Sequence, residues 1–238
     1  IFPLEIKSYK KVKILQWLGS NQSDYCCPII KNDIFKDHQN FKFIWKEILK
    51  EIENFDIIFL NKQPEYIEKT LNPFVQFLKN VFHSKVYQID LSKIDDNLSY
   101  IKNNKFTSEF KRTKKKLTEN YQVEFQNYFL ANQIDLIDRI IKKKISYLEK
   151  KRISHSVSND FINLNKKLSI TYPDKLVAGV LKINNEIVAA NIGIIENRRF
   201  YYLVPVVFSD KYSSFSPGKQ LIYKLINWSK NNQVDSFD

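Results

Sequence analysis

The stretch FYYLVPVVFSDKYSSFSPGKQ, residues 200–220, decides the fold, because it places a strand, a loop and the start of a helix in direct succession. The apolar and β-branched run Phe200–Phe208 is typical of a strand. Proline cannot donate to a β-ladder, so Pro205 predicts an edge or a bulge within this strand. Ser216 and Pro217 are residue types preferred at a helix N-cap and at the first helical position. We therefore expect a disturbed strand that is followed closely by the amino end of a helix.

The amino end of that helix has the features of an anion-binding site. The first N–H groups of any helix lack internal partners and carry partial positive charge. Gly218 would let a phosphate approach the backbone, and Lys219 adds a full positive charge. A bulge at Pro205 would also separate the strand from its neighbour and free backbone groups beside the helix. The stretch therefore predicts a pyrophosphate site, although an ordinary capped helix would use the same residue types.

The neighbouring segments extend this unit into a sheet. Two further strands, 176–183 and 187–195, precede it, and Asn184-Asn185 between them suits a tight turn because asparagine tolerates positive φ. Residues 234–238 are typical of a strand that is just beginning. The order of elements predicts an α+β fold with a mixed central sheet flanked by helices. The helices expected before the sheet lie at residues 40–52, 106–117, 134–148 and 161–168.

The composition is that of a globular protein. Of 238 residues, 43% are hydrophobic and 27% charged, which fits one large or two small domains and excludes a disordered chain. The sequence has no run of about 18 uncharged apolar residues and no signal-peptide pattern at its start. Cys26 and Cys27 are adjacent and show no metal-ligand spacing, so we expect a cytoplasmic protein without a metal. The missing methionine and the strand that begins at residue 234 indicate a fragment truncated at both ends.

Positive charge is concentrated in the middle of the chain. Residues 101–152 contain 14 Lys and Arg against 6 Asp and Glu, which is +8 of the net charge of +12. Lys111, Arg112 and Lys115 lie on the polar face of the helix expected there. Such a block can attract nucleic acid, an anionic membrane or a phosphorylated small molecule, and a solvated helix face explains it equally well. Few aromatic residues are interleaved with these charges, which disfavours nucleic acid.

Four stretches that together span most of the chain are residues 18–25, 106–125, 183–190 and 210–238. In this order they resemble the CelD/BioF-type acetyltransferase domain of the GNAT superfamily, which is similar to the FemAB aminoacyl transferases. The resemblance implies two related GNAT-like lobes, residues 1–100 and 101–238. The sequence departs from the family in having one glycine, Gly218, at the phosphate loop, and it ends before the family's Tyr-Lys pair.

The resemblance implies acyl transfer from an acyl-CoA to an amine acceptor. The reaction needs a base, a donor for the oxyanion, and two substrates held together. The catalytic residues expected are Asp238, Asp210 and Tyr202. The acyl-CoA is expected to contact Val204, Val206, Ser216, Gly218, Lys219 and Gln220, with an oxyanion donor near residues 204–206. The acceptor is expected to contact Lys111, Arg112, Lys115, Tyr201 and Tyr212.

Two alternatives keep the fold and change the function. An aminoacyl-tRNA, as in the FemAB transferases, would replace acyl-CoA as the donor, and the basic block favours this because tRNA is a polyanion. A catalytically inactive GNAT-like module would only bind a partner, and the incomplete phosphate loop favours that interpretation. A fold alone does not establish an activity.

Overall fold

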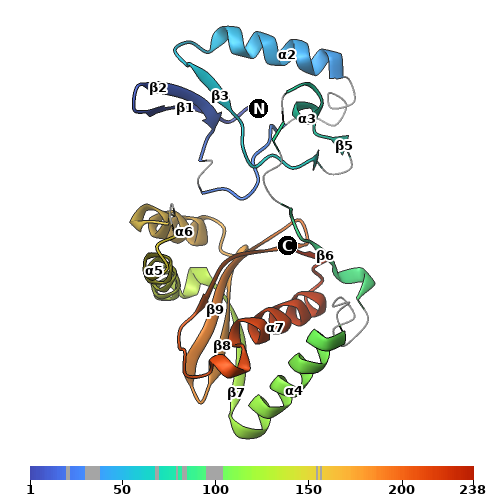
Figure 1. The fold of residues 1–238 in the computed structure, drawn as a ribbon, viewed down its shortest axis with the longest axis vertical. Coiled ribbons are helices and arrows are strands. Elements are labelled where there is room, and N and C mark those ends of the chain that lie inside the picture. Colours follow the sequence, from blue (N-terminus) through green and yellow to red (C-terminus); the bar gives the residue numbers. More distant parts are fainter. Residues whose placement is uncertain are drawn as a thin grey trace. The chain divides into compact units, whose positions relative to one another are not determined.

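The computed structural model describes residues 1–19, 22–29, 38–67, 70–78, 80–81, 85–94, 104–153, 155 and 157–238 (Figure 1). The chain divides into two compact units, Ile1–Lys85 and Val86–Asp238. The division falls before the boundary expected near residue 100, which itself lies outside the described residues. The reason is that strand β6 (Ile89–Asp90) pairs with β11 (Ser236–Phe237) and so belongs to the second unit.

The first unit is a small sheet packed with an aromatic core. Strands β1 and β2 are antiparallel, and β3 pairs with β2 in parallel. Strands β4 and β5 form a separate antiparallel hairpin. Four large aromatic side chains are buried, and the ring centroids of Trp45 and Phe74 lie 4.9 Å apart, edge to face. Asn72 caps the second helix, because its Oδ1 accepts from the Phe74 N–H at 3.1 Å. The elements are β1 (Leu4–Tyr9), β2 (Val12–Trp17), α2 (His38–Glu51), β3 (Ile57–Phe59), β4 (Tyr66–Ile67), β5 (Thr70–Leu71) and α3 (Pro73–Phe77).

The second unit is a six-stranded mixed sheet with helices on both faces (Figure 1). The strand order is β6-β11-β10-β9-β8-β7, and the pair β10–β11 is parallel while the others are antiparallel. The predicted α+β class with a mixed central sheet is therefore confirmed. The remaining elements are η1 (Leu91–Lys93), α4 (Asn104–Asn120), β7 (Val123–Phe129), η2 (Leu130–Asn132), α5 (Ile134–Lys150), α6 (Asn159–Thr171), β8 (Leu176–Ile183), β9 (Glu186–Glu196), β10 (Arg199–Val207), η3 (Ser213–Phe215) and α7 (Pro217–Asn231).

Two apolar layers hold the helices on this sheet. Successive side chains of a strand point to opposite faces, so β8 contributes Val177 and Leu181 to the layer under α4 and α7. It contributes Ala178 and Val180 to the layer under α5 and α6. The side chains of β8 are almost all buried, which explains why its sequence is apolar without alternation.

Strand β10 is irregular, but not where the proline lies. Its pairing with β9 shifts between Tyr202 and Val204, so the bulge is at Leu203. Pro205 stays in the ladder opposite Asn191. The Phe208 N–H donates to the Val188 carbonyl of β9 at 2.8 Å. The backbone N–H and C=O groups of successive strand residues point to alternate sides, so the backbone groups of residue 205 point away from β9. The expected bulge at Pro205 is wrong, because this position requires no N–H and the ladder tolerates proline there.

A cation–aromatic contact joins the two helices on the α4 and α7 face. Lys114 Nζ of α4 donates to the Tyr223 hydroxyl of α7 at 3.2 Å and lies 4.3 Å from the centre of its ring. Phe110 packs on the same ring, with centroids 5.3 Å apart. Burial raises the pKa of Tyr223, but hydrogen bonds from Asn227 and Lys114 outweigh it, so the pKa lies below its usual value.

We expect Lys114→Met to lower the free energy of unfolding by about 1 kcal/mol, because it removes both the hydrogen bond and the cation–aromatic contact. Urea unfolding measures this, and in the background of Tyr223→Leu, which removes both the hydroxyl and the ring, most of the loss should disappear. Lys115→Met is the matched control, because Lys115 is exposed and its one ion pair with a described residue lies within α4, with Glu119 at 3.7 Å. Additive losses for Lys114→Met and Tyr223→Leu would contradict the contact.

Candidate functional site

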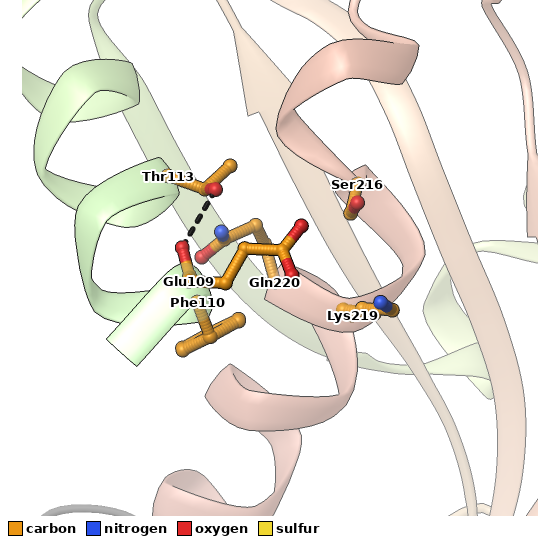
Figure 2. A pocket seen from close by; sticks show the side chains of 6 residues that line it. All are labelled: Glu109, Phe110, Thr113, Ser216, Lys219 and Gln220. Atoms are coloured by element: carbon orange, nitrogen blue, oxygen red, sulfur yellow. Dashed lines mark hydrogen bonds between the residues drawn. The ribbon is translucent and has the colours of Figure 1, made fainter. Parts of the chain in front are cut away.

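The first turn of α7 and the facing side of α4 line a pocket (Figure 2). Three of its residues were expected at an acyl-CoA site, namely Ser216, Lys219 and Gln220. The other three come from α4 and were not anticipated: Glu109, Phe110 and Thr113. All three lie within the helix expected over residues 106–117, but the sequence carried no signal that α7 packs against this helix.

The backbone at the start of α7 shows which donors are available there. Ser216 occupies the N-cap position in the left-handed region, with φ 50° and ψ 60°, and its side chain makes no capping bond. Its carbonyl accepts from the N–H groups of Lys219 at 2.9 Å and Gln220 at 3.2 Å. Pro217 has no N–H. Within the described part of the chain, Gly218 therefore carries the first-turn N–H that has no acceptor, and the Ser216 hydroxyl makes no cap.

Gly218 lies against the end of β10. A Cβ atom at this position would meet Val207 Cγ2 at 3.6 Å, which is ordinary van der Waals contact. The fold therefore accepts alanine here. A substitution of Gly218 can therefore test whether a ligand approaches the backbone here without also disturbing the fold.

Glu109 brings a negative charge to the same place. Figure 2 shows its side chain extending from α4 into the space beside the first turn of α7. Thr113 Oγ1 donates to the Glu109 backbone carbonyl at 2.8 Å and leaves the carboxylate itself uncommitted. A carboxylate is favoured near the positive end of a helix, so Glu109 takes the place where the partial positive charge of α7 would attract a phosphate. Binding of an anion here must displace or neutralise this side chain.

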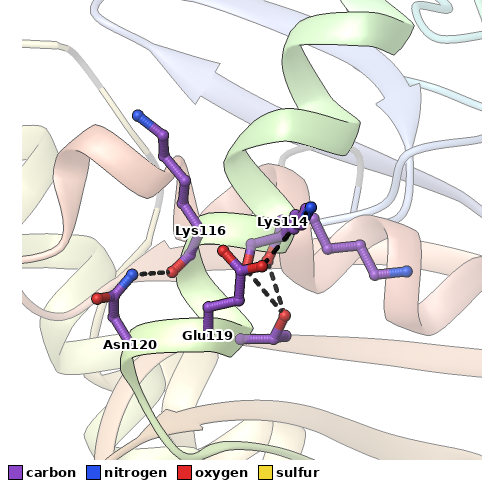
Figure 3. Close-up of polar contacts among 6 residues, drawn as sticks. Lys114, Lys116, Glu119 and Asn120 are labelled. Carbon is purple, nitrogen blue, oxygen red and sulfur yellow. Dashed lines mark hydrogen bonds and ion pairs between the residues drawn. The ribbon is translucent and has the colours of Figure 1, made fainter.

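The three cations expected to contact the acceptor lie on α4 but outside the pocket. Lys111, Arg112 and Lys115 are exposed, and none of them lines it. The end of the helix is held by local bonds: Asn120 Nδ2 donates to the Lys116 carbonyl at 2.7 Å, while the Lys116 side chain extends outward (Figure 3). The outer face of α4 is thus an exposed basic surface, and contact of its cations with a substrate stays a prediction.

The tyrosines expected at the site differ in their surroundings. Tyr212 is 2% exposed and packs edge to face on Tyr121 in the core, and its contact with the acceptor stays a prediction. Burial raises the pKa of Tyr202 well above its usual range and keeps the phenol neutral. The Tyr202 ring lies beside Phe237, with centroids 5.8 Å apart. Tyr201 faces the opposite side of the sheet, where Arg199 lies 5.5 Å from its ring centre.

The two aspartates expected as bases lie at opposite ends of β10. The Asp238 N–H donates to the Phe200 carbonyl at 2.9 Å, and its carbonyl accepts from the Tyr202 N–H at 2.8 Å. Asp210 lies exposed beyond the other end, on the loop before α7. The span Tyr202–Val207 between them measures roughly 17 Å at the rise of a strand. They cannot both act on one reacting atom.

Val204 and Val206 do not offer the expected contacts. Their side chains are 5% and 7% exposed and belong to the apolar layer under α5 and α6. The N–H groups of Val204 and Val206 also face β9, because these residues lie four and two positions before Phe208, whose N–H donates to β9. The predicted oxyanion donor from the backbone of residues 204–206 is untested, but it is disfavoured because the N–H groups of Val204 and Val206 face the ladder with β9 and Pro205 has none.

The described residues contain no cluster of three or more His, Cys, Asp or Glu side chains arranged to hold a metal ion. In the same part of the chain, no helix combines the length and the apolar character needed to cross a membrane.

Comparison with known proteins gives a family and a fold. The model of a family described as Acetyltransferase (GNAT) domain matches residues 104–238. This range contains α4, α7 and the pocket between them. No curated protein matches the sequence.

Three solved structures share the fold over nearly the whole chain. FemX is 9% identical, with 99% of this chain and 74% of FemX covered at a TM-score of 0.63. A conserved protein of unknown function from Bacteroides thetaiotaomicron is 14% identical, with 100% and 73% covered at a TM-score of 0.56. A C-terminal domain (DUF2156) assigned to a lysylphosphatidylglycerol synthetase of Agrobacterium fabrum is 10% identical, with 99% and 69% covered at a TM-score of 0.56. At these identities the likeness is one of fold.

Proposed function

Because the chain belongs to the GNAT acetyltransferase domain family, we propose that it is an N-acyltransferase that moves an acyl group from acyl-CoA to an amine. The observation that carries the proposal is the family match over residues 104–238, which includes the pocket at the first turn of α7. A cytoplasmic location, expected from the cysteine pattern, is part of the proposal.

In this proposal the pyrophosphate of the donor binds at the first turn of α7. The Gly218 N–H, the Ser216 hydroxyl and the Lys219 ammonium are the donors there, and the helix end adds partial positive charge. The extended arm of the donor then follows β10 from Val207 towards the bulge at Leu203. This direction brings the thioester to the end of the strand where Asp238 and Tyr202 lie.

The reaction then needs two proton movements. The amine attacks the thioester carbon and loses a proton to the Asp238 carboxylate. The carbon–sulfur bond breaks, and the sulfur leaves as a thiolate that takes a proton from a neutral donor. The Asp238 carboxyl, now protonated, is that donor. Tyr202 can only donate a hydrogen bond to the sulfur, because burial keeps its phenol protonated. Asp238 and Tyr202 occupy neighbouring strands at the same level of the sheet.

We expect Gly218→Val to abolish binding of acetyl-CoA to the full-length protein, because a branched side chain would occupy the place of the pyrophosphate. Calorimetric titration measures this. Gly218→Ala is the matched variant, with a Cβ atom at an ordinary 3.6 Å from Val207, and it should weaken binding less without destabilising the protein in urea. Acetyl-CoA affinity that is equal in all three proteins would reject this site.

A second donor class is favoured by one observation. The outer face of α4 is basic and exposed, as binding of a polyanion such as an aminoacyl-tRNA requires. Titration at rising salt separates the donors, since tRNA binding falls steeply with salt and acyl-CoA binding falls far less. Binding of neither donor would leave a GNAT-like module that only binds a partner.

A further inference from the structure

A lysine on the opposite face of the sheet lies at the irregular strand. Lys144 belongs to α5, which packs across β10, and its Nζ donates to the Pro205 carbonyl at 3.4 Å. The side chain is half-buried, and burial alone lowers the pKa of its ammonium. Among the described residues no carboxylate pairs with it, whereas Lys166 of the neighbouring α6 pairs with Asp138 at 2.7 Å.

An ammonium in this setting is costly without an anion. Moving a charge out of water is unfavourable unless a counter-charge or several hydrogen bonds compensate. The long bond to one carbonyl compensates poorly. Exposing the side chain would be cheaper, as for Lys142 on the same helix, which is exposed. An anionic group that arrives with a ligand or forms during a reaction would compensate the charge of Lys144.

The backbone beside Lys144 lacks the donor that an oxyanion would need. Alternation turns residue 205 away from β9, so its carbonyl faces the side of β10 on which β11 lies. An ordinary residue would present an N–H on that side as well, but Pro205 has none. The Lys144 ammonium lies 3.4 Å from the Pro205 carbonyl oxygen and so supplies N–H donors where the backbone has none.

We propose that Lys144 is a catalytic residue that donates a hydrogen bond to the oxyanion formed on the thioester carbonyl. The inference rests on the proposed acyl transfer. As the amine nitrogen bonds to the carbonyl carbon, the carbonyl electron pair moves to oxygen, and the Lys144 ammonium donates to that oxygen. When the carbon–sulfur bond breaks, the pair returns to the carbonyl and the thiolate leaves. Lys144 keeps its proton throughout.

The test compares three variants of the full-length protein. Lys144→Met should lower kcat about 100-fold or more, as expected for loss of one oxyanion donor, with little change in the KM for acetyl-CoA. Lys142→Met is the control on the same helix and should keep kcat within twofold. Lys144→Arg should restore part of kcat, because the guanidinium also donates.

The pH dependence gives a readout that a merely structural lysine would not change. The charged ammonium stabilises an oxyanion far better than the neutral amine does, so kcat should fall as pH rises through the lowered pKa of Lys144. No charged side chain of the described residues contributes to that shift. In Lys144→Arg the fall should move to higher pH, because arginine stays protonated.

Failure of the inference and failure of the proposed function give different results. A wild-type protein that binds acetyl-CoA and releases CoA with an amine, while Lys144→Met keeps its kcat, overturns the role of Lys144 alone. A wild-type protein that neither binds acetyl-CoA by calorimetry nor releases CoA with any primary amine of a panel overturns the proposed function, and this inference with it.

Discussion

Gly193→Ala is expected to destabilise the second unit by about 3 kcal/mol, at the upper end of the usual cost of overpacking a core. An added Cβ would lie 2.6 Å from Phe200 Cζ and 2.8 Å from the Tyr201 backbone carbonyl oxygen. Phe200 is fully buried, and its ring stacks on Phe237 at 5.0 Å, so it has nowhere to move. The carbonyl is part of β10 itself. Urea unfolding of the purified variant measures the loss.

Two other glycines serve as controls for this result. At Gly179 the added Cβ would lie 2.6 Å from Leu225 Cδ2, which is the end of a flexible side chain and can yield more cheaply. Gly218→Ala meets only ordinary contacts, and the higher helix propensity of alanine would favour it by up to about 1 kcal/mol. We expect the losses to rank Gly193, then Gly179, then Gly218. An unchanged unfolding midpoint for Gly193→Ala would mean that β9 and β10 can separate without cost.

The meander and the helix after it could be predicted from the sequence because their signals are local. The turn at Asn184-Asn185 is confirmed, since both residues have positive φ, 48° and 65°. The strands expected at 176–183 and 187–195 correspond to β8 and β9. Alternation, turn residues and a Ser-Pro helix start each act within a few positions, so no knowledge of distant partners is needed.

The site could be predicted only in part, because its missing half depends on contacts far apart in the chain. The first turn of α7 was found, but Glu109 and its neighbours come from a helix about a hundred residues earlier. Lys144 carried no signal at all, because a lysine in a basic block is ordinary until the carbonyl beside it is known. The bulge was misplaced for a similar reason: whether Pro205 breaks the ladder depends on which side of β10 faces β9.

Asp238→Asn is expected to lower kcat by about 10²–10⁴-fold, the usual contribution of a general base, and to change the KM for acetyl-CoA little. The asparagine keeps the shape of the side chain but cannot take the proton of the attacking amine. The backbone bonds of Asp238 to Phe200 and Tyr202 do not involve the side chain, so the pairing of β11 with β10 is retained. Steady-state kinetics of the full-length protein with acetyl-CoA and an amine measures the effect.

Asp210→Asn is the matched control, and it distinguishes the two ends of β10. Asp210 lies on the loop before α7, beyond Val207, which is itself roughly 17 Å along the strand from Tyr202, the partner of Asp238, so Asp210 lies on the α7 side and far from the proposed reacting carbon. Removing its negative charge should strengthen acetyl-CoA binding slightly and leave kcat within twofold. If Asp210→Asn lost turnover and Asp238→Asn did not, the reacting carbon would lie at the α7 end of the strand. The direction proposed for the donor along β10 would then be reversed.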